Sequence, residues 1–371
     1  MSFCACMASV TRGAQQLRPA TRLHARGLAA QVFDRQLKQH HRERAASNLE
    51  SLNQYSYLRD EIAERLMDRL DDVHESYSFG DAIDLCAGSG SVRRALEGRG
   101  GVQRLLELDS SPAMLAASAA NEAAHAAKLP APDGDDDEEA PIEVTRKVFD
   151  DENPKLERES ADLIVSNMAL HWVNDLPATL AAARRALRPN GLFLGAMLGG
   201  ETLAEMRSAF VLADLERKGG VAQRMSPLCS VADAGALLQA AGFALPTVDT
   251  EVLTVRYPDA WTLWNHLRGM GESHATVHRS HADLETLTAA AAIYQELYGD
   301  PEDGSIPATF QLIYLTGWSP HESQQRPLER GSAQLSLKDL NLPGLEDSLK
   351  DLAKGTPAKF PPSGGDPDAG R

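Results

Sequence analysis

Short apolar runs recur through the middle of the chain, and each ends in a polar residue before a stretch with helical spacing begins. Runs of this length bounded by turn residues predict buried strands. Five strands are predicted, at residues 81–85, 102–108, 142–149, 161–166 and 192–197. Helices are predicted between them, at 92–96, after the cap Ser110-Ser111-Pro112, and at 176–187. This alternation predicts a parallel sheet with helices on its faces.

Further elements flank these five strands. Tyr57, Leu58, Ile62, Leu66 and Leu70 recur at helical spacing and predict an amphipathic helix docked on the core. A turn is predicted at 188–191, helices at 201–217, 231–241, 261–269 and 284–298, and two more strands at 247–257 and 310–318. The predicted fold is therefore α/β: a doubly wound, mostly parallel seven-stranded sheet with a helical N-terminal segment and inserted C-terminal helical elements.

The N-terminus has the composition of a targeting segment. Residues 1–33 contain Arg12, Arg18, Arg22 and Arg26 and no acidic residue, and they are rich in alanine, serine and threonine. An arginine-rich, acid-free leader is typical of a mitochondrial transit peptide and lacks the long apolar centre of a secretory signal. A disordered terminus without a targeting role is the alternative.

The composition shifts along the chain suggest four regions. They are a transit peptide at 1–30, an N-terminal helical segment at 31–78, a methyltransferase-like domain at 79–335 and a disordered tail at 336–371. An acidic, proline-containing stretch at 129–141 is interpreted as a solvated insertion into the domain.

Charge and cysteine content exclude several classes of function. The formal net charge of the 371 residues is −16, which argues against a nucleic-acid-binding protein, because such binding depends on clustered lysine and arginine. Four cysteines without paired CxxC motifs indicate neither a disulfide framework nor a zinc ribbon. No apolar run approaches the roughly 20 residues that a membrane span needs, so we expect a soluble or peripheral protein.

Candidate chemistry gathers at the ends of the first strands. Gly88 and Gly90 follow the first strand and allow close approach of a ligand to the backbone, and Asp84 lies just inside this turn. Asp109 follows Gly88 by 21 residues at the end of the next strand, where a carboxylate can accept both ribose hydroxyls. The third glycine of the dinucleotide fingerprint is replaced by Arg93, so the pattern favours a nucleoside-containing cofactor other than NAD.

Four segments in order resemble the class I S-adenosylmethionine-dependent methyltransferases. They are 84–90 (DLCAGSG), 108–115 (LDSSPAML), 162–167 (DLIVSN) and 187–191 (LRPNG). The resemblance implies that S-adenosylmethionine is the cofactor and that Asp84, Gly88 and Gly90 hold its methionine end. It further implies that Asp109 holds the ribose and Asp150 or Asp151 the adenine, and it adds Asn167 to the cofactor site. Cys86 departs from the family, which often places its first glycine there.

Other segments narrow the resemblance to the family of mitochondrial complex I assembly factor 5, over residues 32–335. They are 32–38 (VFDRQLK), 166–177 (SNMALHWVNDLP), 195–203 (GAMLGGETL), 269–273 (GMGES), 304–309 (GSIPAT) and 317–324 (GWSPHESQ). This likeness implies hydroxylation of an arginine on an iron-sulfur core subunit of respiratory complex I at an early stage of assembly. It also implies a location in the mitochondrial matrix, with peripheral contact to the inner membrane. Methyl transfer and a non-catalytic chaperone role stay open as alternatives.

The catalytic residue is not identified by these patterns. His171 follows the fourth strand and is the candidate, whereas Trp172 is equally consistent with a packing role. Hydroxylation often uses Fe(II) bound by two histidines and a carboxylate. His266, His274, His278 and His281 cluster in sequence, but they are interpreted as surface histidines, and no metal site is predicted. Buried Cys86 is interpreted as a small apolar filler. Residues 201–207, Glu322 and Arg326 are candidates for binding a substrate arginine, and the alternative is that they form helix caps and surface ion pairs.

Overall fold

The computed structural model describes residues 31–73, 77–96, 98–127, 141–152 and 154–324. The chain divides into two compact units, Met1–Glu322 and Ser323–Arg371, and every helix and strand named below belongs to the first. The predicted transit peptide, the tail at 336–371 and the acidic insertion apart from Pro141 lie outside the described residues.

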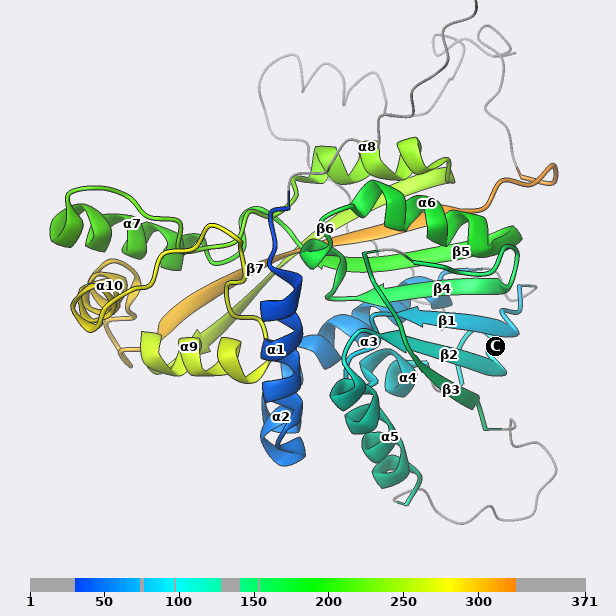
Figure 1. Cartoon of the computed structure of the whole chain (residues 1–371), viewed down its shortest axis with the longest axis horizontal. Helices are drawn as coiled ribbons and strands as arrows, with labels where there is room; N and C mark the ends of the chain where they lie inside the picture. The colour runs from blue at the N-terminus through cyan, green and yellow to red at the C-terminus, as the bar shows by residue number, and fades with distance from the viewer. Residues whose placement is uncertain (1–30, 74–76, 97, 128–140, 153, 325–371) are drawn as a thin grey trace, which may run out of the picture. The chain divides into compact units, whose positions relative to one another are not determined.

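The predicted doubly wound sheet is confirmed (Figure 1). The strands are β1 (Asp81–Leu85), β2 (Arg104–Asp109), β3 (Glu143–Val148), β4 (Ala161–Asn167), β5 (Leu187–Leu198), β6 (Ala244–Tyr257) and β7 (Ile306–Trp318), in the order β3-β2-β1-β4-β5-β7-β6. The first five are parallel, and β7 pairs antiparallel with both β5 and β6. The strand order reverses between β1 and β4, which is where ligands bind in open α/β sheets.

Helices cover both faces of the sheet. They are α1 (Arg35–Ala46), α2 (Leu49–Tyr55), α3 (Tyr57–Asp71), α4 (Ser91–Ala95), α5 (Pro112–Ala126), α6 (Leu176–Ala186), α7 (Ala204–Lys218), α8 (Val231–Ala241), α9 (Ala260–Gly269) and α10 (Leu284–Tyr298), with a 3₁₀ turn, η1 (Leu170–Trp172). One core joins α3, α4, α7, α9 and α10 to the sheet, and a second joins α6 and α8 to its other face. The long pair β6 and β7 extends beyond the other strands toward α7, α9 and α10 (Figure 1).

Most predicted element boundaries agree with the structure within a few residues, and two differ. The turn predicted at 188–191 falls inside β5, because the strand already pairs at Leu187 and resumes regular pairing at Leu192. The residues between form a bulge in which Asn190 has a positive φ of 68°. The helix predicted from residue 201 begins at Ala204, because Gly200–Leu203 forms a turn whose Leu203 has a positive φ of 53°.

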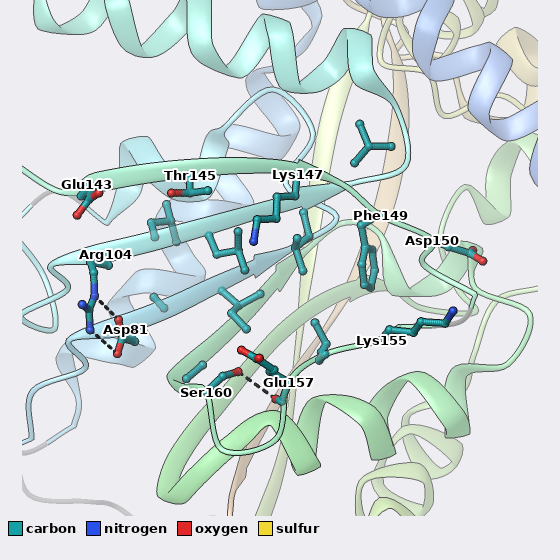
Figure 2. A pocket seen from close by; sticks show the side chains of 18 residues that line it. Asp81, Arg104, Glu143, Thr145, Lys147, Phe149, Asp150, Lys155, Glu157 and Ser160 are labelled. Carbon is teal, nitrogen blue, oxygen red and sulfur yellow. Dashed lines mark hydrogen bonds and ion pairs between the residues drawn. The ribbon is translucent and has the colours of Figure 1, made fainter.

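Beside β1, β2 and β3, one face of the sheet is covered by no helix of the described residues. The connection between β3 and β4 forms no helix among its described residues, and a cavity of about 830 Å³ lies beside β1, β2 and β3 (Figure 2). Lys147, Phe149 and Asp150 line it, as does the Asp81–Arg104 ion pair. The glycine turn does not line this cavity, so its size alone does not mark it as the site of the predicted chemistry. No helix among the described residues has both the length and the apolar character needed to cross a bilayer.

Candidate functional site

The turn after β1 meets the end of β2 at the carboxylate of Asp109. The backbone N–H of Gly88 donates to Oδ2 of Asp109, and that of Ser111 donates to Oδ1, each over 2.8 Å. Gly88 and Gly90 have φ values of +62° and +80°, as their glycine identity predicts, and Cys86 adopts +65°. Gly90 is also crowded, since a Cβ there would lie 2.5 Å from Oγ of Ser118. Cys86 stands where the family often has its first glycine. Its backbone keeps the left-handed conformation there, which strains a residue that has a side chain.

The carboxylate of Asp109 is already paired within the protein. Arg42 of α1 donates from Nη2 to Oδ2 of Asp109, and both side chains are buried. A Cβ on Gly88 would lie 3.2 Å from Nη1 of Arg59 and 3.7 Å from Nη2 of Arg42. The guanidinium groups of these two arginines therefore fill the space directly above the glycine turn.

Arg42 belongs to a basic stripe on α1. Arg35, Lys38 and Arg42 are spaced i, i+3 and i+7, which places them on one helix face. Arg35 pairs with Asp151, which follows β3, Lys38 pairs with Glu272, and Arg42 pairs with Asp109. The helix therefore closes over the carboxyl ends of the strands through three ion pairs with acidic groups from three different parts of the chain.

Asp84 contrasts with Asp109, because its carboxylate accepts no hydrogen bond from the described residues. It is fully buried, and neither Oδ1 nor Oδ2 has a partner. Burial, together with the neighbouring Glu107 and Asp109 carboxylates, raises the pKa of Asp84 well above its usual value, and Arg59 and Arg42 only partly oppose this. A buried carboxylate without a partner is costly, so Asp84 is suited to receive a cationic or hydrogen-bond-donating group of a ligand.

Glu272, in the turn after α9, is the centre of a second cluster. Its carboxylate accepts hydrogen bonds from Lys38 Nζ at 2.9 Å, Arg59 Nη2 at 3.0 Å and Trp172 Nε1 at 2.6 Å. Nε2 of His171 lies 3.6 Å from Oε2 of Glu272. Lys38 and Arg59 hold the pKa of Glu272 well below its usual value despite burial, so this carboxylate is ionised.

The comparisons with known proteins identify the family. A family model described as a methyltransferase domain matches residues 83–195, which span β1 to β5. A curated protein from Danio rerio, named "Arginine-hydroxylase NDUFAF5, mitochondrial", is 39% identical over 311 residues, covering 84% of this chain and 89% of the relative. The chain belongs to the family of mitochondrial arginine hydroxylases.

A human protein of the arginine-hydroxylase family, with the same name, is 38% identical over 312 residues, covering 83% of each chain. Among solved structures, the YcgJ protein from Bacillus subtilis aligns with a TM-score of 0.45 at 14% identity, over 69% of this chain and 99% of that one. The methyltransferase-domain match and the sheet order together confirm the predicted class I methyltransferase-like fold and support binding of S-adenosylmethionine. The family's mitochondrial location agrees with the prediction from the basic leader.

The other residues predicted to bind the cofactor, Asn167, Asp150 and Asp151, do not share one environment. Asn167 donates from Nδ2 to the backbone oxygen of Arg59 and to Oγ of Ser91, so its amide ties α3 to α4. Asp151 is buried beside Cys86, whereas Asp150 is exposed and lines the large cavity. The structure therefore brings Asp84, Gly88, Asp109 and Asp151 to one region and leaves Asp150 outside it.

The clustered histidines do not come together as a ligand set. His266 contacts Tyr57, and Nε2 of His274 shares a hydrogen bond with Thr276. No group of three His, Cys, Asp or Glu side chains able to hold a metal ion occurs within the part of the chain that the structure describes. Arg207 donates to backbone oxygens of Gly200 and Thr202, which is the local capping role considered for the 201–207 stretch.

Burial explains the remaining sequence candidates. Burial raises the pKa of Cys86 well above its usual value, which agrees with its interpretation as a filler. The Trp172 ring packs edge-on against Phe33, with Nζ of Lys38 3.5 Å from the ring centre, so it supports the N-terminal segment.

Sequence reasoning missed Arg42, Arg59 and Glu272 as site residues. The i, i+3, i+7 basic spacing on α1 and the family-like segment 269–273 were the available signals.

Buried histidines make stability depend on pH. Burial lowers the pKa of His41 and of His274 from 6.5 to about 4, so the folded protein takes up these protons only near pH 4, whereas the unfolded chain takes them up near 6.5. Since the unfolded chain binds more protons between these values, the free energy of unfolding should fall by at most about 3 kcal/mol for each histidine as pH decreases from 6.5 to 4. Urea unfolding at pH 7, 6 and 5 measures this slope. His41→Gln should reduce the dependence of the free energy of unfolding on pH, whereas His40→Gln, at the exposed neighbouring position, should not. Equal slopes in the wild type and both variants would show that His41 does not cause the pH dependence.

Proposed function

We propose that this protein hydroxylates an arginine side chain on an iron-sulfur core subunit of respiratory complex I, during an early stage of assembly in the mitochondrial matrix. The observation that carries the proposal is the similarity to named arginine hydroxylases across more than four-fifths of the chain. The reaction converts a C–H bond into C–OH and consumes dioxygen and a two-electron donor.

The described residues fit S-adenosylmethionine on one condition. The unpartnered carboxylate of Asp84 matches the ammonium group of the methionine moiety, and Gly88, which has no Cβ, allows close approach to its backbone once the guanidinium groups of Arg59 and Arg42 above it have moved. Asp109 would hold the ribose and Asp151 the adenine amino group. Asp109 can accept from both ribose hydroxyls only after Arg42 has moved away, because Arg42 and two backbone N–H groups now take three of its about four acceptor positions. When bound, the cofactor would supply an electrophilic sulfonium beside the strand ends.

This chain's own groups would then orient the reactants. Arg59 lies over Gly88 and also bonds Glu272, so its guanidinium connects the cofactor turn to the Glu272 cluster. The fixed cations and carboxylates stand in a buried region where their interactions are little screened, and this arrangement pre-organises charge around a bound side chain.

The family and the charge support the proposed partner and the proposed membrane contact. A net charge of −16 favours approach to a basic surface on the client subunit. Contact with the matrix face of the inner membrane would be peripheral, through the assembling complex. Two other functions are tested alongside: methyl transfer, and a chaperone role in which a bound cofactor only stabilises the fold.

Mass spectrometry of the client subunit separates the three functions. We expect the client from cells with the wild-type protein to gain one oxygen on an arginine; a gain of CH₂ would support methyl transfer, and an unmodified client with failed assembly the chaperone. Asp84→Asn should abolish the modification, because it removes the carboxylate at the cofactor turn. Asp81→Asn is the matched control at the other end of β1, where the side chain pairs with Arg104 and Arg188 away from the turn. Equal modification by both variants would contradict the role of Asp84.

A further inference from the structure

A second cavity, of about 230 Å³, lies at the carboxyl ends of β4 and β5, between those strands, α7 and α9. Its wall is largely apolar. The side chains of Met168, Met206, Met225 and Met270 line it together with Phe210 and Trp264. Binding sites of this kind are mostly apolar with a few polar groups that set orientation, and this volume suits one side chain more than a drug-sized ligand.

Three of the polar residues that line this cavity, His171, Ser226 and Glu272, carry groups able to orient a ligand. Nδ1 of His171 accepts a hydrogen bond from the backbone N–H of Leu198 at 3.5 Å, so the proton of the neutral ring is on Nε2. That Nε2 lies 3.6 Å from Oε2 of Glu272, beyond an ordinary hydrogen bond, and no described residue offers it a closer partner, although the side chain is fully buried. Oγ of Ser226 is likewise buried without a partner, and the ionised carboxylate of Glu272 completes the set.

We propose that this cavity binds the side chain of the arginine to be hydroxylated, with its guanidinium on Glu272 and its methylene stem against the methionines. This inference rests on the proposed function and adds the place where the substrate side chain binds. Arginine fits because it combines an apolar stem with a planar head that only donates hydrogen bonds. The Nε2–H of His171 can donate to the oxygen that hydroxylation places on the stem.

Glu272 has room for the incoming guanidinium. A carboxylate offers about four acceptor positions, and Glu272 accepts three hydrogen bonds from the protein. The arriving charge is compensated nearby, because burial lowers the pKa of Lys38 to about 7, so this lysine can release its proton when a second cation approaches. Arg224 lines the cavity and is bound to the buried carboxylate of Asp214 through two hydrogen bonds.

Methyl NMR of the methionines tests the site without requiring turnover. The full-length protein labelled with ¹³C at the methionine methyl groups is titrated with Nα-acetyl-arginine N-methylamide and with the uncharged citrulline analogue. We expect the four cavity methyls to shift saturably with arginine, and at least a tenfold weaker response to citrulline, which lacks the charge that Glu272 binds. Shifts confined to Met67, Met114 and Met197, or equal responses to both probes, would overturn the proposal.

Variants of the cavity wall complete the test. Glu272→Gln should weaken arginine binding at least tenfold, and Ser226→Trp should abolish it by filling the cavity, which keeps the test decisive if the first variant fails to fold. Gln223→Trp is the control, because it places the same ring at an exposed position of the same loop. Unchanged arginine binding in Ser226→Trp would overturn the site. If the cavity binds arginine but the client never gains oxygen, the proposed function is wrong and the binding site stands. If the client gains oxygen but the cavity methionines do not respond to arginine, the binding site is wrong and the proposed function stands.

Discussion

Asp109→Ala is expected to lower the free energy of unfolding by about 3–5 kcal/mol, the cost typical of leaving one charge of a buried ion pair without its partner. Arg42 is buried, and its Nη2 donates to the Asp109 carboxylate. The same change also leaves the N–H groups of Gly88 and Ser111 without their acceptor. Chemical denaturation of the full chain, followed by circular dichroism, measures the loss.

A double-mutant cycle separates the ion pair from the backbone contacts. Arg42→Leu alone should cost less than Asp109→Ala, because the remaining carboxylate keeps two backbone N–H donors. Combining both changes should recover part of the loss caused by Asp109→Ala, since the double variant no longer buries a guanidinium without its carboxylate. Strictly additive losses would show that Arg42 and Asp109 do not interact.

The sheet and the residues at its strand ends were predictable because the relevant signals are local. Each strand is a short apolar run, and Asp84 and Asp109 lie within or directly at the end of such runs, so parallel pairing alone brings them to one edge. The left-handed glycines of the turn follow from residue type. The bulge in β5 was misread as a turn because proline, asparagine and glycine occur together in both structures.

The pairing of charges was not predictable, because it joins residues far apart in the sequence. Arg42 lies 67 residues before Asp109, and Lys38 lies 234 before Glu272. Helical periodicity shows that the basic residues of α1 share a face, but it does not say which carboxylates that face meets. Likewise, an isolated glutamate in a glycine-rich turn carries no mark of burial, and Glu272 becomes a candidate only when three donors are seen to converge on it.

Arg42, in the basic stripe on α1, can affect the binding of S-adenosylmethionine in two ways. If Arg42 competes with the ribose for Asp109, the protein must break a buried ion pair before it can bind S-adenosylmethionine, and the measured affinity is reduced by that cost. If Arg42 instead turns to contact the cofactor, for example its carboxylate, its removal weakens binding. Replacing Arg42 should strengthen the binding of S-adenosylmethionine in the first case and weaken it in the second.

Arg42→Leu is expected to tighten the binding of S-adenosylmethionine by about tenfold to a hundredfold, which corresponds to about 1.4–2.8 kcal/mol. The reason is that Asp109 would keep its backbone donors and its position but lose its internal cation, leaving its oxygens accessible to the ribose hydroxyls. Isothermal titration calorimetry of the full chain measures the dissociation constant. Arg44→Leu, on the same helix and without an ion pair to these carboxylates, should leave it unchanged. Weaker binding in Arg42→Leu would reverse the assignment and make Arg42 a ligand of the cofactor, whereas the loss of stability expected for Asp109→Ala would remain, because it depends on contacts within the protein and not on the cofactor.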